Sequence, residues 1–150
     1  MSNQNFHTSI LVNQSPSEVF NAVNNPRAWW SADIEGNTDQ LDAKWTYRFG
    51  DSHRTSLRTV EISPDKKVVW LIEDNYFKTP KFAGEWTGNE ITFDIAREGD
   101  KTKLTFTQIG LVPANACYDV CQGAWTGFVH QSLQRLIATG KGDLKWYEKK

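Results

Sequence analysis

Near its C-terminal end the chain carries the feature that most constrains its fold, a long amphipathic segment. Apolar side chains recur there at intervals of three and four residues, as on one face of a helix, at Phe128, Val129, Leu133, Leu136 and Ile137. Gly140 followed by Lys141 is an ordinary helix stop. A helix from about Ala116 to Thr139 would be roughly 36 Å long at ~1.5 Å per residue, enough to cross a small domain. Its apolar face must pack against another element, which we expect to be a sheet.

Helix signals otherwise occur only after a first strand at 9–12. Ser15-Pro16-Ser17-Glu18 opens a helix, with a capping hydroxyl, proline in the first turn and glutamate three residues after the cap. Asn25-Pro26 ends this helix, and a second short one starts at 27–30, because the residue before proline is disfavoured in helical geometry. From residue 44 the hydrophobic period changes to two, which predicts strands at 44–49, 56–62, 67–74, 90–96 and 103–108.

This order of elements predicts an α+β fold. One curved antiparallel sheet of about six strands wraps around one long C-terminal helix, with two short helices after the first strand. A chain of 150 residues suits a single domain, here residues 1–150. We see no internal repeat, linker or low-complexity segment.

The charge pattern argues against several classes of partner. Lys and Arg number 17 against 18 Asp and Glu, and they are scattered, so neither nucleic acid nor an anionic membrane is expected as a partner. No apolar run is long enough to span a bilayer, and the first seven residues lack the basic and apolar regions of a leader. We therefore expect a cytoplasmic protein with no membrane insertion, whose two cysteines are reduced.

Five stretches carry more specific motifs: Ser15-Pro16-Ser17-Glu18-Val19-Phe20 with Trp29-Trp30, Val68-Val69-Trp70, Glu85-Trp86-Thr87-Gly88, Thr102 to Thr107 followed by Gly110-Leu111, and Trp125 to Gly142. Together and in this order they resemble the START and birch-pollen-allergen (SRPBCC) superfamily. Within it they resemble the branch named after the C-terminal domain of the activator of the heat-shock protein 90 ATPase. The run from Cys117 to Cys121 is similar to a small stand-alone bacterial group of that branch. The resemblance extends from Phe6 to Gly142 and implies a helix-grip fold.

The resemblance also implies a cavity between sheet and helix, which other members of the superfamily use for lipids, steroids, polyketides and other apolar molecules. Independently, seven tryptophans and eight phenylalanines supply large side chains that line ligand pockets well. The same aromatic spacing is typical of a filled core, so both interpretations stay open at each position. The aromatic pocket candidates are Trp30, Phe49, Trp70, Trp86, Phe93, Trp125 and Phe128.

Two polar side chains are expected on inward faces. Alternation along the strand that ends at Ile62 places Arg58 on the core side, where it needs a carboxylate from Asp74, from Glu85 or from a ligand. Alternatively, Arg58 reaches solvent at the sheet edge. Gln108 shares a face with the apolar residues of the last strand. Relatives tend to have histidine at this position, and glutamine orients ligands without titrating.

Other polar candidates lie in a turn and at the start of the long helix. His53 is either a polar group at the pocket mouth or a solvated turn residue. Cys117 and Cys121 share a helix face near Trp125, where a thiol pKa can be lowered, or they are small packing residues. The chain has no ligand-spaced histidine pair and no glycine-rich phosphate loop, so we assign no catalytic residue, metal site or cofactor.

The function predicted first is binding of an apolar or aromatic small molecule. The branch name implies an alternative, a co-chaperone or other protein-interaction domain that contacts a chaperone. A further alternative is a weak enzyme of cyclase, hydrolase or isomerase type, as some members of the superfamily are. The chain is expected to be a monomer, or a homodimer that closes the pocket with its partner copy.

Overall fold

The computed structural model describes residues 5–148. The first four residues, on which the expected lack of a leader partly depends, lie outside the described residues, as do the last two. The strands are β1 Phe6–Val12, β2 Ile34–Gly36, β3 Lys44–Phe49, β4 His53–Ser63, β5 Lys67–Phe77, β6 Glu90–Glu98 and β7 Lys101–Ile109. The helical elements are α1 Pro16–Val23, α2 Pro26–Trp29, η1 Pro80–Phe82, α3 Tyr118–Gly127, η2 Phe128–Leu133, α4 Gln134–Thr139 and η3 Trp146–Glu148.

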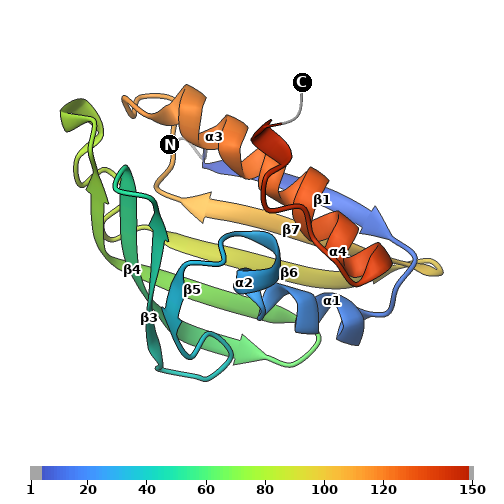
Figure 1. Ribbon diagram of the computed structural model, residues 1–150. Helices are drawn as coiled ribbons and strands as arrows, with labels where there is room; N and C mark the ends of the chain where they lie inside the picture. Colours follow the sequence, from blue (N-terminus) through green and yellow to red (C-terminus); the bar gives the residue numbers. More distant parts are fainter. Residues whose placement is uncertain (1–4, 149–150) are drawn as a thin grey trace.

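The strands form one antiparallel sheet in the order β1-β7-β6-β5-β4-β3-β2. The sheet curves, and α3 and α4 run across it on one side, with α1 and α2 beside them (Figure 1). This arrangement confirms the predicted α+β helix-grip architecture. The sheet has one strand more than the expected six, because the three-residue β2 pairs with β3. So short a strand has no alternation for the sequence to reveal.

The long C-terminal helix is confirmed as well. α3, η2 and α4 follow one another without a break from Tyr118 to Thr139, with a six-residue π-helical stretch in the middle. Gly140 ends the helix with φ 86°, a left-handed conformation that glycine adopts without steric cost. The π-helical stretch was not predicted from the sequence.

The first helix begins as its sequence predicts. The Ser15 hydroxyl accepts the backbone N–H of Glu18 at 3.2 Å, and the Glu18 carboxylate accepts the backbone N–H of Ser15 at 3.0 Å. This reciprocal capping satisfies two N–H groups that the first turn leaves unpaired. It fixes the point where the chain turns from β1 towards the tryptophans at the end of α2.

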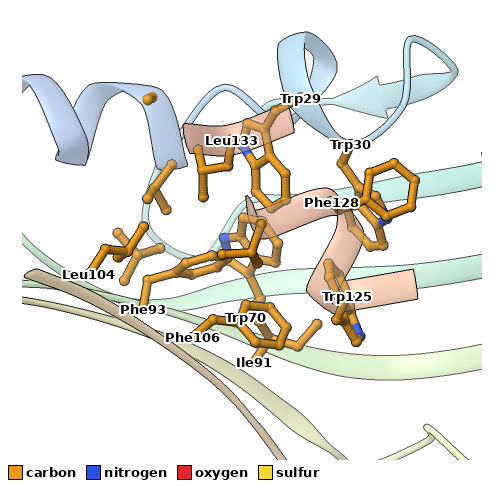
Figure 2. Close-up of a cluster of buried hydrophobic side chains, with 14 of the residues drawn as sticks. Trp29, Trp30, Trp70, Ile91, Phe93, Leu104, Phe106, Trp125, Phe128 and Leu133 are labelled. Carbon is orange, nitrogen blue, oxygen red and sulfur yellow. The ribbon is translucent and has the colours of Figure 1, made fainter. Parts of the chain in front are cut away.

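A filled aromatic core lies between the long helix and the middle of the sheet. We define it by four buried side chains, Trp29, Trp70, Phe93 and Phe106. Trp70 stacks on Trp29 at 6.4 Å and meets Phe93 edge-on at 4.8 Å between ring centroids, and Phe93 meets Phe106 edge-on at 5.4 Å. Figure 2 shows these rings filling the space between the helix and the strands. Offset and edge-on contacts of this kind add to the stabilisation from buried area.

The expected inward position of Arg58 is wrong. The register between β4 and β5 shifts at Val60, where β4 has one extra residue, so alternation counted back from Ile62 inverts beyond that point. Thr55, Leu57 and Thr59 face inward instead and are buried. Arg58 lies on the outer face with a 31% exposed side chain and pairs with Glu73 at 3.0 Å and Asp42 at 3.5 Å. The partners expected from sequence, Asp74 and Glu85, make neither contact.

Candidate functional site

A cavity of about 310 Å³ opens at one end of the helix-grip fold. Its walls come from the β3–β4 hairpin, the connection between β5 and β6, the start of the long helix and the C-terminal segment around η3. We call it the aromatic cavity, because ten of its sixteen lining residues are tryptophan, tyrosine or phenylalanine. Seven sequence-predicted residues line it: Trp30, Phe49, His53, Trp86, Cys121, Trp125 and Phe128.

Five other predicted residues do not line the cavity: Arg58, Trp70, Phe93, Gln108 and Cys117. Arg58 lies on the opposite face of the sheet. Trp70 and Phe93 belong to the filled core, one layer behind the wall, where Trp70 stacks against Trp30 at 5.9 Å. Alternation placed these two rings on the correct face of the sheet. It does not indicate where along the space between sheet and helix the filled core ends and the cavity begins.

Gln108 acts one layer behind the cavity. Its side chain is completely buried; its amide oxygen accepts the indole N–H of Trp125 at 2.7 Å, and its amide nitrogen donates to Asn89 Oδ1 at 2.9 Å. An amide satisfies both partners at once, because it is a donor and an acceptor. Gln108 therefore orients a tryptophan of the cavity wall, whereas the sequence suggested direct orientation of a ligand.

The tryptophans of the wall hold one another in place. Trp30 stacks on Tyr47 at 3.9 Å, and Trp125 lies between Trp30 at 4.9 Å and Trp86 at 5.8 Å. Figure 2 shows Trp125 and Phe128 of the helix approaching Trp30, which follows α2. Rings from sheet, helix and connecting segments thus fix the shape of the wall, which makes a largely pre-formed apolar pocket.

His53 is the polar side chain of the wall with the best-defined environment. Its Nε2 is hydrogen-bonded to the hydroxyl of Thr55 at 2.8 Å and to the side-chain amide nitrogen of Asn75 at 3.1 Å. The ring stacks on Phe77 at 4.1 Å and meets Trp86 edge-on at 4.7 Å. Burial among these groups lowers the pKa of His53 to about 3, so the ring is neutral at physiological pH.

The two cysteines are reduced and adjacent at the start of the long helix. The Sγ atoms of Cys121 and Cys117 are in direct contact, with the S–H of Cys121 directed at Cys117. This contact lowers the pKa of Cys117; it also raises the pKa of Cys121, and burial adds to that rise. Cys121, the thiol that lines the cavity, therefore stays protonated at neutral pH and is a poor nucleophile.

Glu85 has a structural role at the same place. Its two carboxylate oxygens accept the backbone N–H groups of Ala116 at 2.8 Å and Cys117 at 2.9 Å. These donors precede the first turn of α3, where backbone N–H groups lack partners within the helix. The segment before β6 is thereby tied to the start of the long helix, which holds two walls of the cavity together.

Nine further residues line the cavity and were not predicted from the sequence: Tyr47, Ser52, Phe77, Thr79, Phe82, Val120, Ala124, Trp146 and Tyr147. The C-terminal pair is the least expected, because the sequence beyond Gly140 has no periodicity. Trp146 lies so close over Gly127 that an added Cβ would overlap its ring. Tyr147 contacts Phe49 across the mouth at 5.6 Å. The signal in the sequence that could have identified this segment is the adjacent aromatic pair Trp146 and Tyr147 within an otherwise polar tail.

The arrangement is suited to apolar binding more than to acid–base chemistry. None of the sixteen lining residues is acidic or basic at neutral pH, given that His53 is neutral. Among residues 5–148, no cluster of three or more metal-ligating side chains is present. Within the same range, no helix combines the length and the apolar character needed to cross a membrane.

The sequence of the chain matches a protein family whose resemblance was inferred from the motifs. Residues 13–138 match the family model described as activator of Hsp90 ATPase homolog 1-like protein, which confirms the resemblance inferred from the motifs. No curated protein matches the chain in sequence.

Solved structures extend the comparison. The Aha1 dimer from Colwellia psychrerythraea is 23% identical with a TM-score of 0.73, covering 92% of this chain and 98% of its own. Protein MLL2253 from Mesorhizobium loti is 14% identical with a TM-score of 0.71, covering 89% and 97%. DynU16, a putative protein in the dynemicin biosynthetic locus, is 19% identical with a TM-score of 0.71, and the match spans 94% of this chain but 49% of DynU16. At these identities the likeness shows the fold alone.

Proposed function

The chain belongs to the family of activator of Hsp90 ATPase homolog 1-like proteins, and we propose that it uses this fold to bind an apolar or aromatic small molecule in the aromatic cavity. The observation that carries the proposal is the cavity itself. It is walled by aromatic rings, whereas the neighbouring core of the same composition is filled. Its volume of about 310 Å³ lies at the lower end of the range of roughly 300–1,000 Å³ for small-molecule pockets.

The stacked wall supports this proposal energetically. Trp30, Trp86 and Trp125 are between 1% and 4% exposed, so the rings are already ordered before a ligand enters. A pre-ordered pocket spares the cost of immobilising side chains on binding, about 0.5–1.5 kcal/mol for each flexible side chain. The volume suits a compact ligand of about two fused rings.

Filling the cavity tests the proposal. Ala124 lines the cavity on α3, and Ala124→Phe places a ring inside it. Ala138→Phe is the matched control, because Ala138 is exposed on α4 of the same helix. Binding of 2-acetylnaphthalene by equilibrium dialysis should fall at least tenfold in the first variant and stay unchanged in the second. Equal affinity in wild type and folded Ala124→Phe would place binding elsewhere.

A second candidate function is contact with a chaperone ATPase, favoured by the family and by apolar side chains around the mouth. Val120 is 64% exposed, Phe49 43% and Tyr147 39%. Val120→Asp should then reduce stimulation of an Hsp90 ATPase by the full chain. If the wild-type chain at saturating concentration leaves the ATPase rate unchanged, this candidate is excluded. The same rim would serve a homodimer, which a solution mass measurement detects.

A third candidate is weak cyclase, hydrolase or isomerase chemistry, for which His53 is the polar group in the best position. A neutral imidazole can accept or donate a proton. Its Nε2, however, is occupied by Thr55 and Asn75. Any such activity would be lost in His53→Phe.

A further inference from the structure

The absence of charged side chains from the lining of the aromatic cavity restricts the ligand further. None of its lining residues is Asp, Glu, Lys or Arg. A charged ligand would lose its hydration without gaining a counter-ion within the wall, and burying an unpaired charge is strongly unfavourable. The walls therefore favour an uncharged ligand.

The position of the proton on His53 follows from its neighbours. Asn75 Oδ1 accepts the backbone N–H of Trp86 at 3.3 Å, which fixes the orientation of the amide and directs its NH₂ group at His53 and Thr55. Thr55 Oγ1 accepts one of these amide protons at 3.1 Å, so its own hydroxyl proton is available for His53. Nε2 thus faces two donors and must be the unprotonated nitrogen. The ring proton resides on Nδ1.

This assignment makes Nδ1 a hydrogen-bond donor on a side chain that lines the cavity. Within residues 5–148, Nδ1 has no hydrogen-bond partner, and it is not among the fully buried polar atoms. The imidazole is held flat against Phe77 and edge-on to Trp86, so it cannot turn to present its other nitrogen without breaking both contacts at Nε2. A ligand atom that accepts a hydrogen bond would pair with Nδ1–H.

We propose that the aromatic cavity selects uncharged, flat aromatic molecules that carry a carbonyl oxygen, which accepts the Nδ1–H of His53. This inference rests on the proposed binding function and adds the chemical class of the ligand. Thr55 and Asn75 act through His53 as positioning residues, because they hold its tautomer. Trp30 and Trp125 supply flat faces for the ring system.

Three probes of nearly equal shape test the proposal with the full chain in equilibrium dialysis. 2-Acetylnaphthalene is neutral and has a carbonyl oxygen, 2-isopropenylnaphthalene replaces that oxygen with a methylene group, and 2-naphthoate is an anion. Wild type should bind the ketone about three- to tenfold more tightly than the alkene, as one hydrogen bond allows, and the anion most weakly. His53→Phe should bind ketone and alkene equally.

Thr79→Val is the matched control, because Thr79 is another polar lining residue and valine keeps its shape. It should leave the ketone-to-alkene ratio unchanged; loss of the ratio there would assign the donor to Thr79 and overturn the proposal. Nitrogen-15 NMR of the His53 ring in wild type gives an independent test, since it distinguishes the two tautomers. A proton on Nε2 would contradict the proposal.

The outcomes separate this inference from the proposed function. If ketone and alkene bind wild type equally, or if naphthoate binds most tightly, the ligand class is wrong while the cavity remains a binding site. If no probe binds up to its solubility limit, the binding function fails and the ligand class fails with it.

Discussion

The filled core and the aromatic cavity are built from the same kinds of side chain, yet the core is filled and the cavity is hollow. In the filled core, Trp29 stacks against both Trp30 and Trp70, and Phe93 meets Trp29 edge-on. At the cavity, rings line the walls but leave about 310 Å³ between them. Aromatic content alone therefore does not indicate a pocket. What matters is whether rings from the facing elements meet. At the cavity, Glu85 ties the segment before β6 to the start of the long helix, and Tyr147 meets Phe49 across the mouth, so the rings enclose a space that they do not fill.

The largest expected effect comes from emptying the filled core. Trp70→Ala removes a completely buried ring that touches Trp29, Trp30 and Phe93. Loss of such a ring costs about 3–5 kcal/mol, so the free energy of unfolding in urea should fall by that amount. A change below about 1 kcal/mol would mean that this region is as loosely filled as the cavity.

Gln108 joins the two regions and should show the next largest effect. Gln108→Leu leaves the buried indole N–H of Trp125 and the Asn89 oxygen without their present partner. Unsatisfied buried groups cost about 1–3 kcal/mol each, so we expect a loss of about 2–3 kcal/mol in urea unfolding. Gln108→His keeps one acceptor and one donor on a neutral ring and should cost less. Equal losses in the two variants would show that the Trp125 bond is unimportant.

The pH dependence of stability tests the environment of His53. Its pKa is 6.5 ordinarily and about 3 in the folded protein, so below pH 6.5 the unfolded chain binds a proton that the folded chain does not. The contribution of His53 to the free energy of unfolding is therefore fully present above pH 6.5. It is lost as the pH falls towards 3, by up to about 1.4 kcal/mol per pH unit.

The matched measurement uses His53→Phe, which removes this titration and leaves the carboxylates unchanged. The stability difference between wild type and variant should shrink, or change sign, as the pH is lowered from neutrality. Parallel pH profiles for the two proteins would show that His53 is solvated, and the tautomer assignment would lose its basis.

The smallest effect is expected at the cavity mouth. Phe49 is 43% exposed, and its ring centroid lies 5.6 Å from that of Tyr147. Phe49→Ala should change the free energy of unfolding by less than about 1 kcal/mol while weakening binding of 2-acetylnaphthalene. If stability falls as far as in Trp70→Ala, the mouth is part of the core and the comparison between the two regions breaks down.

The sequence predicted the fold closely, because its signals are local. The capping residues of α1, the helix stop at Gly140 and the alternation in β3 and β5 to β7 each depend on neighbours within a few positions. The predicted position of Arg58 was wrong because β4 has one extra residue at Val60, which inverts the alternation. The residue types around Val60 do not reveal this irregularity. β2 was missed because three residues are too few to show a period.

The candidate site was predicted only in part, because a cavity depends on contacts between distant segments. Trp30, Trp86 and Trp125 were identified from their residue type, but so were Trp70 and Phe93, and the spacing is the same in a wall and in a core. The role of His53 depends on Asn75, 22 positions away. Trp146 lies over Gly127 although the helix ended several residues earlier.

The most direct test of the account is the response of the seven tryptophan indole signals in a nitrogen-15 NMR titration with 2-acetylnaphthalene. Trp30, Trp86, Trp125 and Trp146 line the aromatic cavity, whereas Trp29, Trp45 and Trp70 do not. Since the ring current of a bound aromatic ligand falls off steeply with distance, the four lining indoles should shift most and the other three least. No shift in any indole up to the solubility of the ligand, or larger shifts in the three core indoles, would contradict the account.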